Sequence, residues 1–384
     1  MRSLKLKEAG AHRAVELSTP QARWLIDQKI ASVQPSYVPG TYDLQVENVA
    51  GIVAVDNLVI HIEPKLPIRS LLWMLAYSST GIDWRPEEVA LEGQTLTSAM
   101  MSLLCTLIED ATRQGLISGY WHAEESLPYL RGRIRTAEQF SRHHGMLYPL
   151  EVSFDEYSNN ISENRILLSA LIEAEMLVPH DDGAVQLLPR IRALLSRFIG
   201  VVPLHPGQPL PAHQGARLTA SYQKALNLAG IFLNRRGIDT ALGSIPARGF
   251  LLDMPQLFED FVVKALQKQT SDFTVQGQLS TPFVSSDKGE RRNIRPDIIV
   301  KHHHNIRFAM DTKYKQANPK LNDIYQLNAY ADTLKLDDVT LIYGERAEPE
   351  MLTTQAGKRI HIRGIDLSAP PTEVLAQITD LLTQ

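Results

Sequence analysis

The stretch RPDIIVKHHHNIRFAMDTKYK, residues 295–315, contains two short apolar runs whose length and β-branched content are typical of buried strands. Charged residues interrupt both runs where a buried strand normally carries valine or isoleucine. Side chains at positions i and i+2 of a strand share a face, so we expect Asp311 and Lys313 on one face and Thr312 on the other. The second run therefore presents an acid and an amine together.

The polar segment KHHHN, residues 301–305, is short enough to be the loop of an antiparallel hairpin between the two runs. A hairpin centred near His304 places Asp297 opposite Asp311, because both lie seven residues from that centre. Directly opposed Cβ atoms are about 4.5–5.5 Å apart, and carboxylates that close repel each other unless a cation lies between them. The pattern predicts a Mg²⁺ or Mn²⁺ site, because these ions suit oxygen ligands better than zinc does. Lys313 would orient or activate a water and offset charge on a phosphate under attack.

A further acid is expected on a helix over residues 255–269, which precedes these strands. Glu259 has Val262 and Leu266 three and seven positions downstream, so it lies on or beside the apolar face. An acid on such a face indicates a role at the site as a metal ligand and supporting residue. The alternative is that the helix face is assigned one residue off, in which case Glu259 is an acid on the helix surface.

Another helix is expected over residues 321–334, where Gln326 and Tyr330 lie one turn apart on a common face. These two side chains either support the site or close the core. The expected order of elements is helix, three strands, helix and strand. These elements carry, in the same order, Glu, Asp, Asp-x-Lys and Gln-x-x-x-Tyr. We expect these side chains to converge on one pocket. The sequence therefore predicts a catalytic set of five residues: Asp297, Asp311, Lys313, Glu259 and Gln326.

Composition sets outer limits on the class of protein. The 384 residues suggest two or three domains, and 44% apolar with 21% charged residues is typical of a globular chain. No apolar run approaches the roughly 18 residues that span a bilayer, and the first residues lack the apolar core of a secretory signal, so we expect a cytoplasmic protein with no membrane partner. The single Cys105 excludes an internal disulfide and a thiolate-clustered zinc site.

The net charge of -4 argues against a wholly basic nucleic-acid coat, but the charge balance changes locally. Residues 288–315 contain eight Lys or Arg against three acids. Beside a phosphate-cleaving pocket, this surplus could contact a nucleic-acid backbone, and the alternative is a solvated basic loop. The candidate contacts are Arg291, Arg292, Arg295, Lys315 and Tyr330.

The chain divides by pattern into three regions of a multidomain α/β protein. Residues 1–160 are mixed and β-rich, with a hairpin expected within 44–62 at the Asp56-Asn57 turn. Residues 161–250 are a helical middle region, in which Ser162 is expected to cap a helix and 238–250 to form a connector. Residues 251–384 form an α/β domain with strands expected at 273–284, 294–300, 306–313 and 339–343.

The ordered residues of the last domain resemble the PD-(D/E)xK nuclease superfamily. Pro296-Asp297 matches its first element, Asp311-Thr312-Lys313 its second, Glu259 its first-helix acid, and Gln326 with Tyr330 its trailing helix. The segments LFEDFV, RPDIIV, DTKYK and QLNAYA are also similar to McrC, the nuclease component of the McrBC modification-dependent restriction system. Upstream, LVIHIEPKLPIRSLLWMLAYSS, LRGRI and FDEYSNNISENRILLSAL extend this similarity over most of the chain.

The resemblance implies Mg²⁺-dependent cleavage of modified double-stranded DNA in defence against foreign DNA. It also implies a partner, an McrB-like hexameric AAA+ GTPase that carries the modified-DNA reader and whose ring receives the N-terminal β-rich part of McrC. The chain has no G-x-x-x-x-G-K-[ST] loop, so we expect it to bind no nucleotide itself. Two alternatives stay open: a non-catalytic activator and assembly subunit of an AAA+ NTPase, or a motor-independent nuclease acting on RNA or unmodified DNA.

Overall fold

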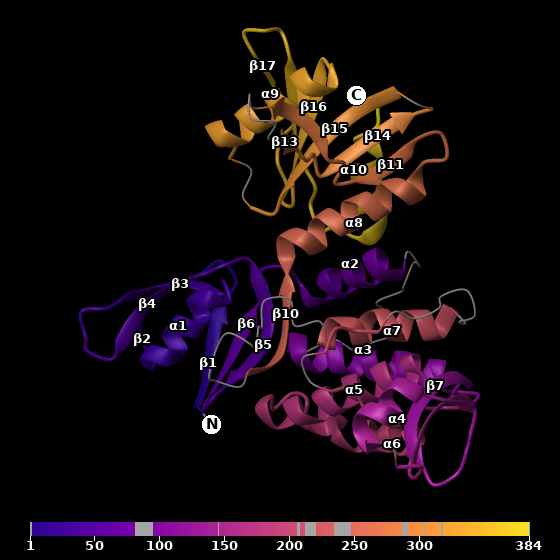
Figure 1. Ribbon diagram of the computed structural model, residues 1–384. Coiled ribbons are helices and arrows are strands. Elements are labelled where there is room, and N and C mark those ends of the chain that lie inside the picture. The colour runs from indigo at the N-terminus through magenta and orange to yellow at the C-terminus, as the bar shows by residue number, and fades with distance from the viewer. Residues whose placement is uncertain are drawn as a thin grey trace. The chain divides into compact units, whose positions relative to one another are not determined.

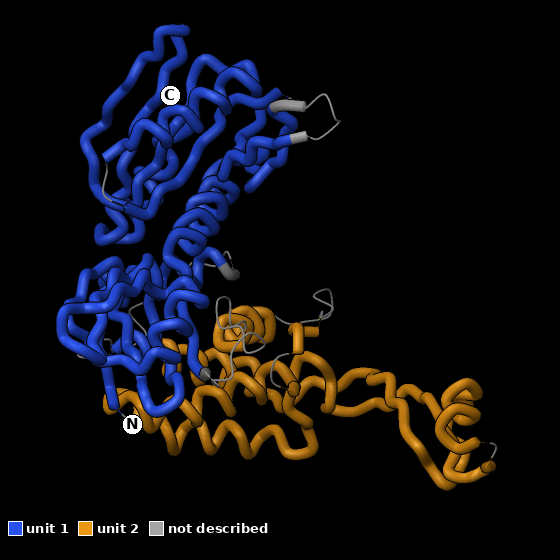
Figure 2. Tube along the Cα trace, turned by 60° about the vertical axis from the view of Figure 1, so that its left-hand side comes forward, with its two compact units in different colours: residues 1–99, 236–384 blue, residues 100–235 orange. Residues whose placement is uncertain are grey.

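The computed structural model shows a mixed α/β protein that divides into two compact units. Unit 1 comprises residues 1–99 and 236–384, and unit 2 comprises residues 100–235 (Figure 2). The sequence-based boundary at residue 160 falls inside unit 2. The structure describes residues 2–80, 95–144, 146–205, 208–211, 220–233, 247–285, 291–303, 305–315 and 318–383. Among these residues, no helix is both long and apolar enough to cross a membrane.

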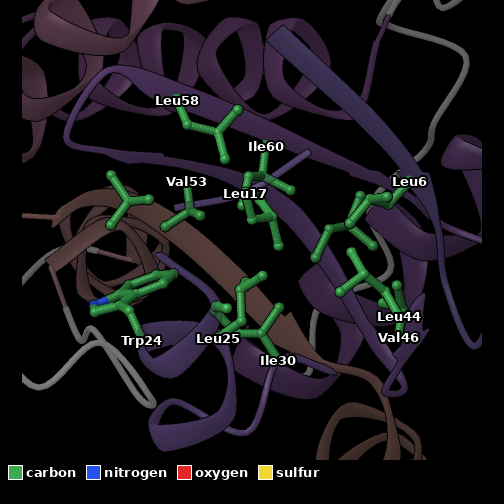
Figure 3. Close-up of a cluster of buried hydrophobic side chains, with 13 residues drawn as sticks. Leu6, Leu17, Trp24, Leu25, Ile30, Leu44, Val46, Val53, Leu58 and Ile60 are labelled. Carbon is green, nitrogen blue, oxygen red and sulfur yellow. The ribbon is translucent and has the colours of Figure 1, made fainter. Parts of the chain in front are cut away.

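The first part of unit 1 consists of two sheets around a shared apolar core. One sheet has the order β1-β6-β5-β10 and the other β2-β4-β3. Figure 3 shows the core between them, where Trp24 and Leu25 of the first helix meet Val53 and Ile60 of the first sheet. The elements are β1 (Arg2–Lys7), β2 (Ala11–Glu16), α1 (Thr19–Asp27), β3 (Ala31–Pro35), β4 (Thr41–Val46), β5 (Val49–Val55), β6 (Leu58–Glu63), α2 (Ile68–Thr80) and β10 (Ala247–Asp253).

The predicted hairpin is confirmed: β5 and β6 pair antiparallel, with Val55 opposite Leu58. Asp56 between them has a φ of 54°, the left-handed conformation that such a tight turn requires. The expected connector over residues 238–250 is wrong at its end, because β10 pairs antiparallel with β5. Gly249, with a φ of +139°, faces the β5 backbone so closely that a Cβ would lie 2.1 Å from the carbonyl oxygen of Ile52. The rest of that stretch, 238–246, lies outside the described residues.

Unit 2 combines helices with a three-stranded sheet of order β7-β9-β8. Asn164 of α5 is fully buried and bonds to the carbonyl oxygens of Ile117 and Asn159 and to the hydroxyl of Tyr222. Ser162 is the first residue of α5 rather than its cap, since Ile161 occupies the cap position without a side-chain bond. The elements are α3 (Leu96–Ala111), β7 (Gly119–Leu127), β8 (Arg133–Ile134), α4 (Thr136–His143), β9 (Leu150–Ser158), α5 (Ser162–Leu177), η2 (Val178–His180), η3 (Val185–Leu187), α6 (Leu188–Leu195), η4 (Ser196–Phe198) and α7 (Ala220–Leu233).

The last part of unit 1 contains a six-stranded mixed sheet of order β11-β14-β15-β16-β18-β17 (Figure 1). Strand β15 is central: it pairs antiparallel with β14 and parallel with β16, which in turn pairs parallel with β18. The elements are α8 (Met254–Gln269), β11 (Thr274–Gly277), β12 (Thr281–Ser285), β13 (Arg291–Ile294), β14 (Ile298–His302), β15 (Asn305–Lys313), α9 (Leu321–Leu334), β16 (Asp338–Tyr343), β17 (Glu350–Thr353), β18 (Arg359–Gly364) and α10 (Pro371–Asp380).

The hairpin of β14 and β15 has the predicted register. Ile298 lies opposite Met310, which puts Asp297 just outside β14 at the level of Asp311. His304, the predicted centre, lies outside the described residues. Both faces of the hairpin are buried, because Ala309 packs in the cluster that includes α9 while Met310 is fully buried on the opposite face. Burial on both faces explains why the strand residues between Asp297 and Asp311 are mainly apolar.

Candidate active site

Asp311 is the most buried acidic side chain of the predicted site, at 1% exposure. Its Oδ1 accepts a hydrogen bond from Nε2 of Gln326 (3.1 Å) and lies 3.4 Å from the hydroxyl of Tyr330. Its Oδ2 lies 2.5 Å from Nζ of Lys313, in ion-pair contact but without hydrogen-bond geometry. Strand β15 thus supplies the acid and the amine, and helix α9 holds the acid in place.

Asp297 is tied to the same strand by two hydrogen bonds. Its Oδ2 accepts one from the backbone N–H of Thr312 (2.8 Å) and one from the Thr312 hydroxyl (2.9 Å). Among the described residues, no donor reaches Oδ1 of Asp297. The structure therefore brings Asp297, Asp311 and Lys313 together at the end of β15 and leaves one oxygen of each carboxylate without a hydrogen-bond donor.

Glu259 lies half-buried on α8, as expected, while its neighbour Asp260 is exposed. Its Oε1 accepts a hydrogen bond from Nε2 of Gln278 (2.6 Å), and the Gln278 backbone N–H donates to the carbonyl oxygen of Asp297 (2.9 Å). The Oε1 atom of Gln278 accepts a hydrogen bond from Arg295. Gln278 therefore links Glu259 to the segment that carries Asp297.

The electrostatics of the site follow from burying acids near one another. Burial and the neighbouring Asp297 raise the pKa of Asp311 to about 6. The same two causes raise the pKa of Glu259 to about 7. Burial lowers the pKa of Lys313, but the Asp311 carboxylate outweighs this effect and the net pKa is raised. The site therefore holds an excess of poorly compensated negative charge, and the lysine remains a cation.

This arrangement fits a divalent cation held by two carboxylates rather than by three. In the part of the chain that the structure describes, Oδ1 of Asp297 is free of donors and Oδ2 of Asp311 is held only by the Lys313 ion pair, and such carboxylate oxygens are the ligands that Mg²⁺ or Mn²⁺ prefers. Within the described ranges, no group of three His, Cys, Asp or Glu side chains is arranged to hold a metal ion. Glu259 is therefore not assembled with the two aspartates as a ready-made three-ligand set, and its predicted metal-binding role stays a prediction.

The predicted nucleic-acid contacts fall into three groups. Arg292 and Arg295 are exposed, and the side chain of Arg291 lies outside the described part of the structure. Lys315 pairs with Asp323 at 2.7 Å. Tyr330 is 2% exposed, so this structure gives it a supporting contact with Asp311 in place of a contact with nucleic acid.

Two contributors were not predicted from the sequence. The alternation of a strand placed Thr312 on the face away from Asp311, yet its backbone N–H and hydroxyl both reach Asp297, because Asp297 lies beyond the end of β14. Gln278 adopts a φ of 51° after β11, a conformation that the sequence does not signal for a glutamine.

The fold and the site together define the class: a mixed α/β protein of two compact units whose C-terminal sheet carries two acids and a lysine at the end of its central strand.

The chain belongs to the family described as McrBC 5-methylcytosine restriction system component, whose model matches residues 44–344. This match confirms, at the level of the family, the similarity drawn from the sequence. A chain of the refined half-complex from a tetradecameric assembly of Thermococcus gammatolerans McrB AAA+ hexamers with bound McrC has a similar fold. Its TM-score is 0.63 at 16% identity, over 99% of this chain and 99% of that chain. The cryo-EM structure of the Thermococcus gammatolerans McrBC complex also matches, with a TM-score of 0.43 and 19% identity over 69% of this chain and 87% of that chain. No curated protein gives a significant match.

Proposed function

We propose that this chain is the nuclease subunit of an McrBC-type restriction system and hydrolyses phosphodiesters of modified double-stranded DNA. The observation that carries the proposal is the grouping of Asp297, Asp311 and Lys313 at the end of one central strand. Membership of the McrBC family supports DNA as the substrate. It also supports an AAA+ GTPase as the partner, because the similar solved chain comes from an assembly of McrB hexamers with bound McrC.

The residues of the site have separate roles in this reaction. Asp297 and Asp311 would hold Mg²⁺, which supplies stabilisation of the charge that develops on the phosphate. Lys313, kept cationic by Asp311, orients the attacking water and faces the phosphate as a hydrogen-bond donor. Glu259, with a pKa of about 7, is matched to accept the proton of that water near neutral pH. Water oxygen forms a new bond to phosphorus, and the bond from phosphorus to the departing sugar oxygen breaks.

Gln326 and Tyr330 act on Asp311 and not on the substrate. Both donor groups sit on Oδ1 of Asp311, which leaves Oδ2 turned to Lys313. Nε2 of Gln326 also lies 2.5 Å from the Tyr330 hydroxyl, so the two α9 side chains form one connected support. Fixing the orientation of a ligand in this way is the ordinary role of groups that surround a metal site.

The docking surface for the GTPase is proposed to be the arm, which we define as residues 119–158 with β7, β8, α4 and β9. In Figure 2 the arm extends from the helical part of unit 2, with α4 at its far end. It carries exposed apolar and aromatic side chains, a feature that marks interaction surfaces: Tyr120, Tyr129, Leu130, Phe140, Met146, Leu147, Tyr148 and Tyr157. Helix α4 is fastened to β9 through Glu151, which pairs with Arg142 and His143.

The catalytic part is tested with Lys313→Ala and Asp311→Ala, and with Asp332→Ala on the exposed face of α9 as the matched control. Cleavage of a 5-methylcytosine duplex is measured with an McrB-type partner, GTP and Mg²⁺. We expect the first two variants to lose cleavage while they stay folded, with one cooperative melting transition, and still stimulate GTP hydrolysis. Cleavage at the unaltered rate by either variant would remove the assignment.

The docking part is tested with the double variant Tyr120→Ser/Leu147→Ser, whose two side chains are 75% and 76% exposed. Met351→Ser on β17 removes an exposed apolar side chain outside the arm and serves as the control. We expect the double variant to lose stimulation of the partner GTPase at least tenfold, and the control to keep it. Equal stimulation by both proteins would show that the arm is not the docking surface.

A further inference from the structure

A cavity of about 330 Å³ lies at the edge of the C-terminal sheet, next to the proposed catalytic residues. The residues that line it follow directly after β15, β16 and β18, and the loop between β6 and α2 adds Lys65. These strands end in line, because Lys313 pairs with Tyr343 and Tyr343 with Gly364. The crevice at the carboxyl ends of parallel strands is where open α/β sheets bind ligands.

A backbone hydrogen bond connects the lining of the cavity to β15, the strand that carries Asp311 and Lys313. The backbone N–H of Gly344, which lines the cavity, donates to the carbonyl oxygen of Lys313 (3.1 Å). Tyr314 and Lys315, the two residues after Lys313, also line it. The cavity is therefore adjacent to the backbone of Lys313, although the Lys313 side chain does not line it.

Three cations and two acids line the cavity, but the cations are not equally available. Lys315 is neutralised by Asp323 at 2.7 Å. Lys65 and Arg346 are exposed, and no carboxylate of the described residues forms an ion pair with either side chain. Of the acids, Asp366 accepts the backbone N–H of Ser368 (3.0 Å) and is thereby engaged in its own turn. Lys65 and Arg346 are thus the cations that an anionic ligand would meet, and the carboxylates of Glu345 and Asp366 line the cavity as well.

Lys65 is held over the sheet edge by packing within unit 1. Its backbone N–H donates to Oε2 of buried Glu8 (2.9 Å), and its Nζ lies 6.0 Å from the ring centroid of Tyr314. The helix that follows, α2, packs on α8 through Trp73 and Phe261, whose ring centroids are 5.0 Å apart. The lysine is therefore presented by a fixed backbone, although it lies more than 200 residues before the sheet.

We propose that this cavity is a phosphate subsite that binds a backbone phosphate of the DNA strand, next to the phosphate at Lys313, with Arg346 and Lys65 as positioning residues. The inference rests on the proposed nuclease function. Neighbouring phosphates of one strand follow each other at about 3.4 Å along the duplex axis, so a strand with a phosphate at Lys313 carries further phosphates close by, and the proposal places one of them in the cavity. Free phosphate or the phosphates of a mononucleotide share the same chemistry, and the test separates these sources.

The test compares Arg346→Ala and Lys65→Ala with Arg307→Ala, an exposed arginine near the other end of β15. Binding of a fluorescent 5-methylcytosine duplex to the full chain is measured by anisotropy over a salt series, and cleavage is measured with partner, GTP and Mg²⁺. Each cavity variant should bind the duplex several-fold more weakly, with a salt dependence smaller by about one counterion per lost contact. The KM should rise while kcat changes little, and Arg346→Lys should restore most of the affinity. Melting profiles check folding.

Each outcome separates the subsite from the function on which it rests. If the unaltered chain cuts the duplex and both cavity variants behave like Arg307→Ala, the subsite is wrong and the nuclease proposal stands. If the unaltered chain neither binds nor cuts, the nuclease proposal fails and the subsite fails with it. If the variants lose binding of GTP or inorganic phosphate but keep the salt dependence of duplex binding, the cavity serves a free phosphate ligand and not DNA.

Discussion

Replacing Asp311 by asparagine should change how the stability of the protein depends on pH. Burial, together with the Asp297 carboxylate, raises the pKa of Asp311 from 3.8 to about 6 in the folded protein. The folded protein therefore binds this proton more tightly than the unfolded chain does. The stabilisation from this proton is fully present below pH 3.8 and is lost as the pH rises through 6.

The magnitude follows from the same pKa values. One pKa unit corresponds to about 1.4 kcal/mol, so between pH 5 and pH 8 the unaltered protein should lose roughly 1–2 kcal/mol of unfolding free energy through Asp311. Asp311→Asn cannot lose it, because the amide does not titrate. Lys313 is charged at both pH values, and its attraction for the ionised Asp311 is already included in the pKa of about 6.

The assay is urea unfolding followed by tryptophan fluorescence, at pH 5 and pH 8, with a chelator present. Asp332→Asn, on the exposed face of α9, is the matched control. The difference in unfolding free energy between Asp311→Asn and the unaltered protein should move in favour of the variant by roughly 1–2 kcal/mol from pH 5 to pH 8. Adding Mg²⁺ at pH 8 should stabilise only the protein that keeps Asp311. A difference that stays constant with pH, or moves the other way, would refute the explanation that burial and the nearby Asp297 raise the pKa of Asp311.

Three further substitutions test the contacts around and beyond the site. Tyr330→Phe removes a hydroxyl 3.4 Å from Asp311, and DNA cleavage should fall about 10-fold to 100-fold with an unchanged melting profile. Thr312→Val removes one of two donors to Asp297 at nearly constant volume, and a smaller loss of cleavage, about tenfold, should be measured in the same assay. Asn164→Ala removes the side-chain donor to two carbonyl oxygens of unit 2 and the Oδ1 acceptor of the Tyr222 hydroxyl. It should lower the unfolding free energy by roughly 2–4 kcal/mol in urea titrations, and a loss under 1 kcal/mol would contradict the burial argument.

Local patterns predicted helix α9 and strand β15, whereas each of the strands expected at 273–284 and 294–300 is divided in two, and Asp297 lies outside β14. The bounds of α9 are those expected from apolar periodicity, 321–334, and the β14–β15 register follows from the equal distances of two acids from a short polar loop. Both features depend on residues that are near one another in the chain. The chemistry of alternating side chains therefore placed Asp311 beside Lys313 before any three-dimensional information was used.

The contacts that the sequence did not predict are those made between distant segments. Strand β10 pairs with β5 across about 200 residues, and its own short run gives no indication of that partner. Gln278 bonds to Glu259 from a left-handed backbone conformation, with a φ of 51°, directly after β11. Strands β17 and β18 also complete the sheet without a motif of their own. Such features depend on packing between elements, which periodicity within one element does not encode.

The β5–β10 pairing has a practical consequence for anyone dividing this protein into pieces. Strand β10 runs without a break into α8 (Figure 1). If the chain is cut at the start of α8, or anywhere before β10, the N-terminal fragment that contains β5 is separated from part or all of the strand that pairs with it. An uncovered strand edge recruits foreign strands and promotes aggregation. A soluble fragment should therefore be obtained by removing unit 2, residues 100–235, and joining the two segments of unit 1. Cutting the chain just before α8 should give a fragment that aggregates.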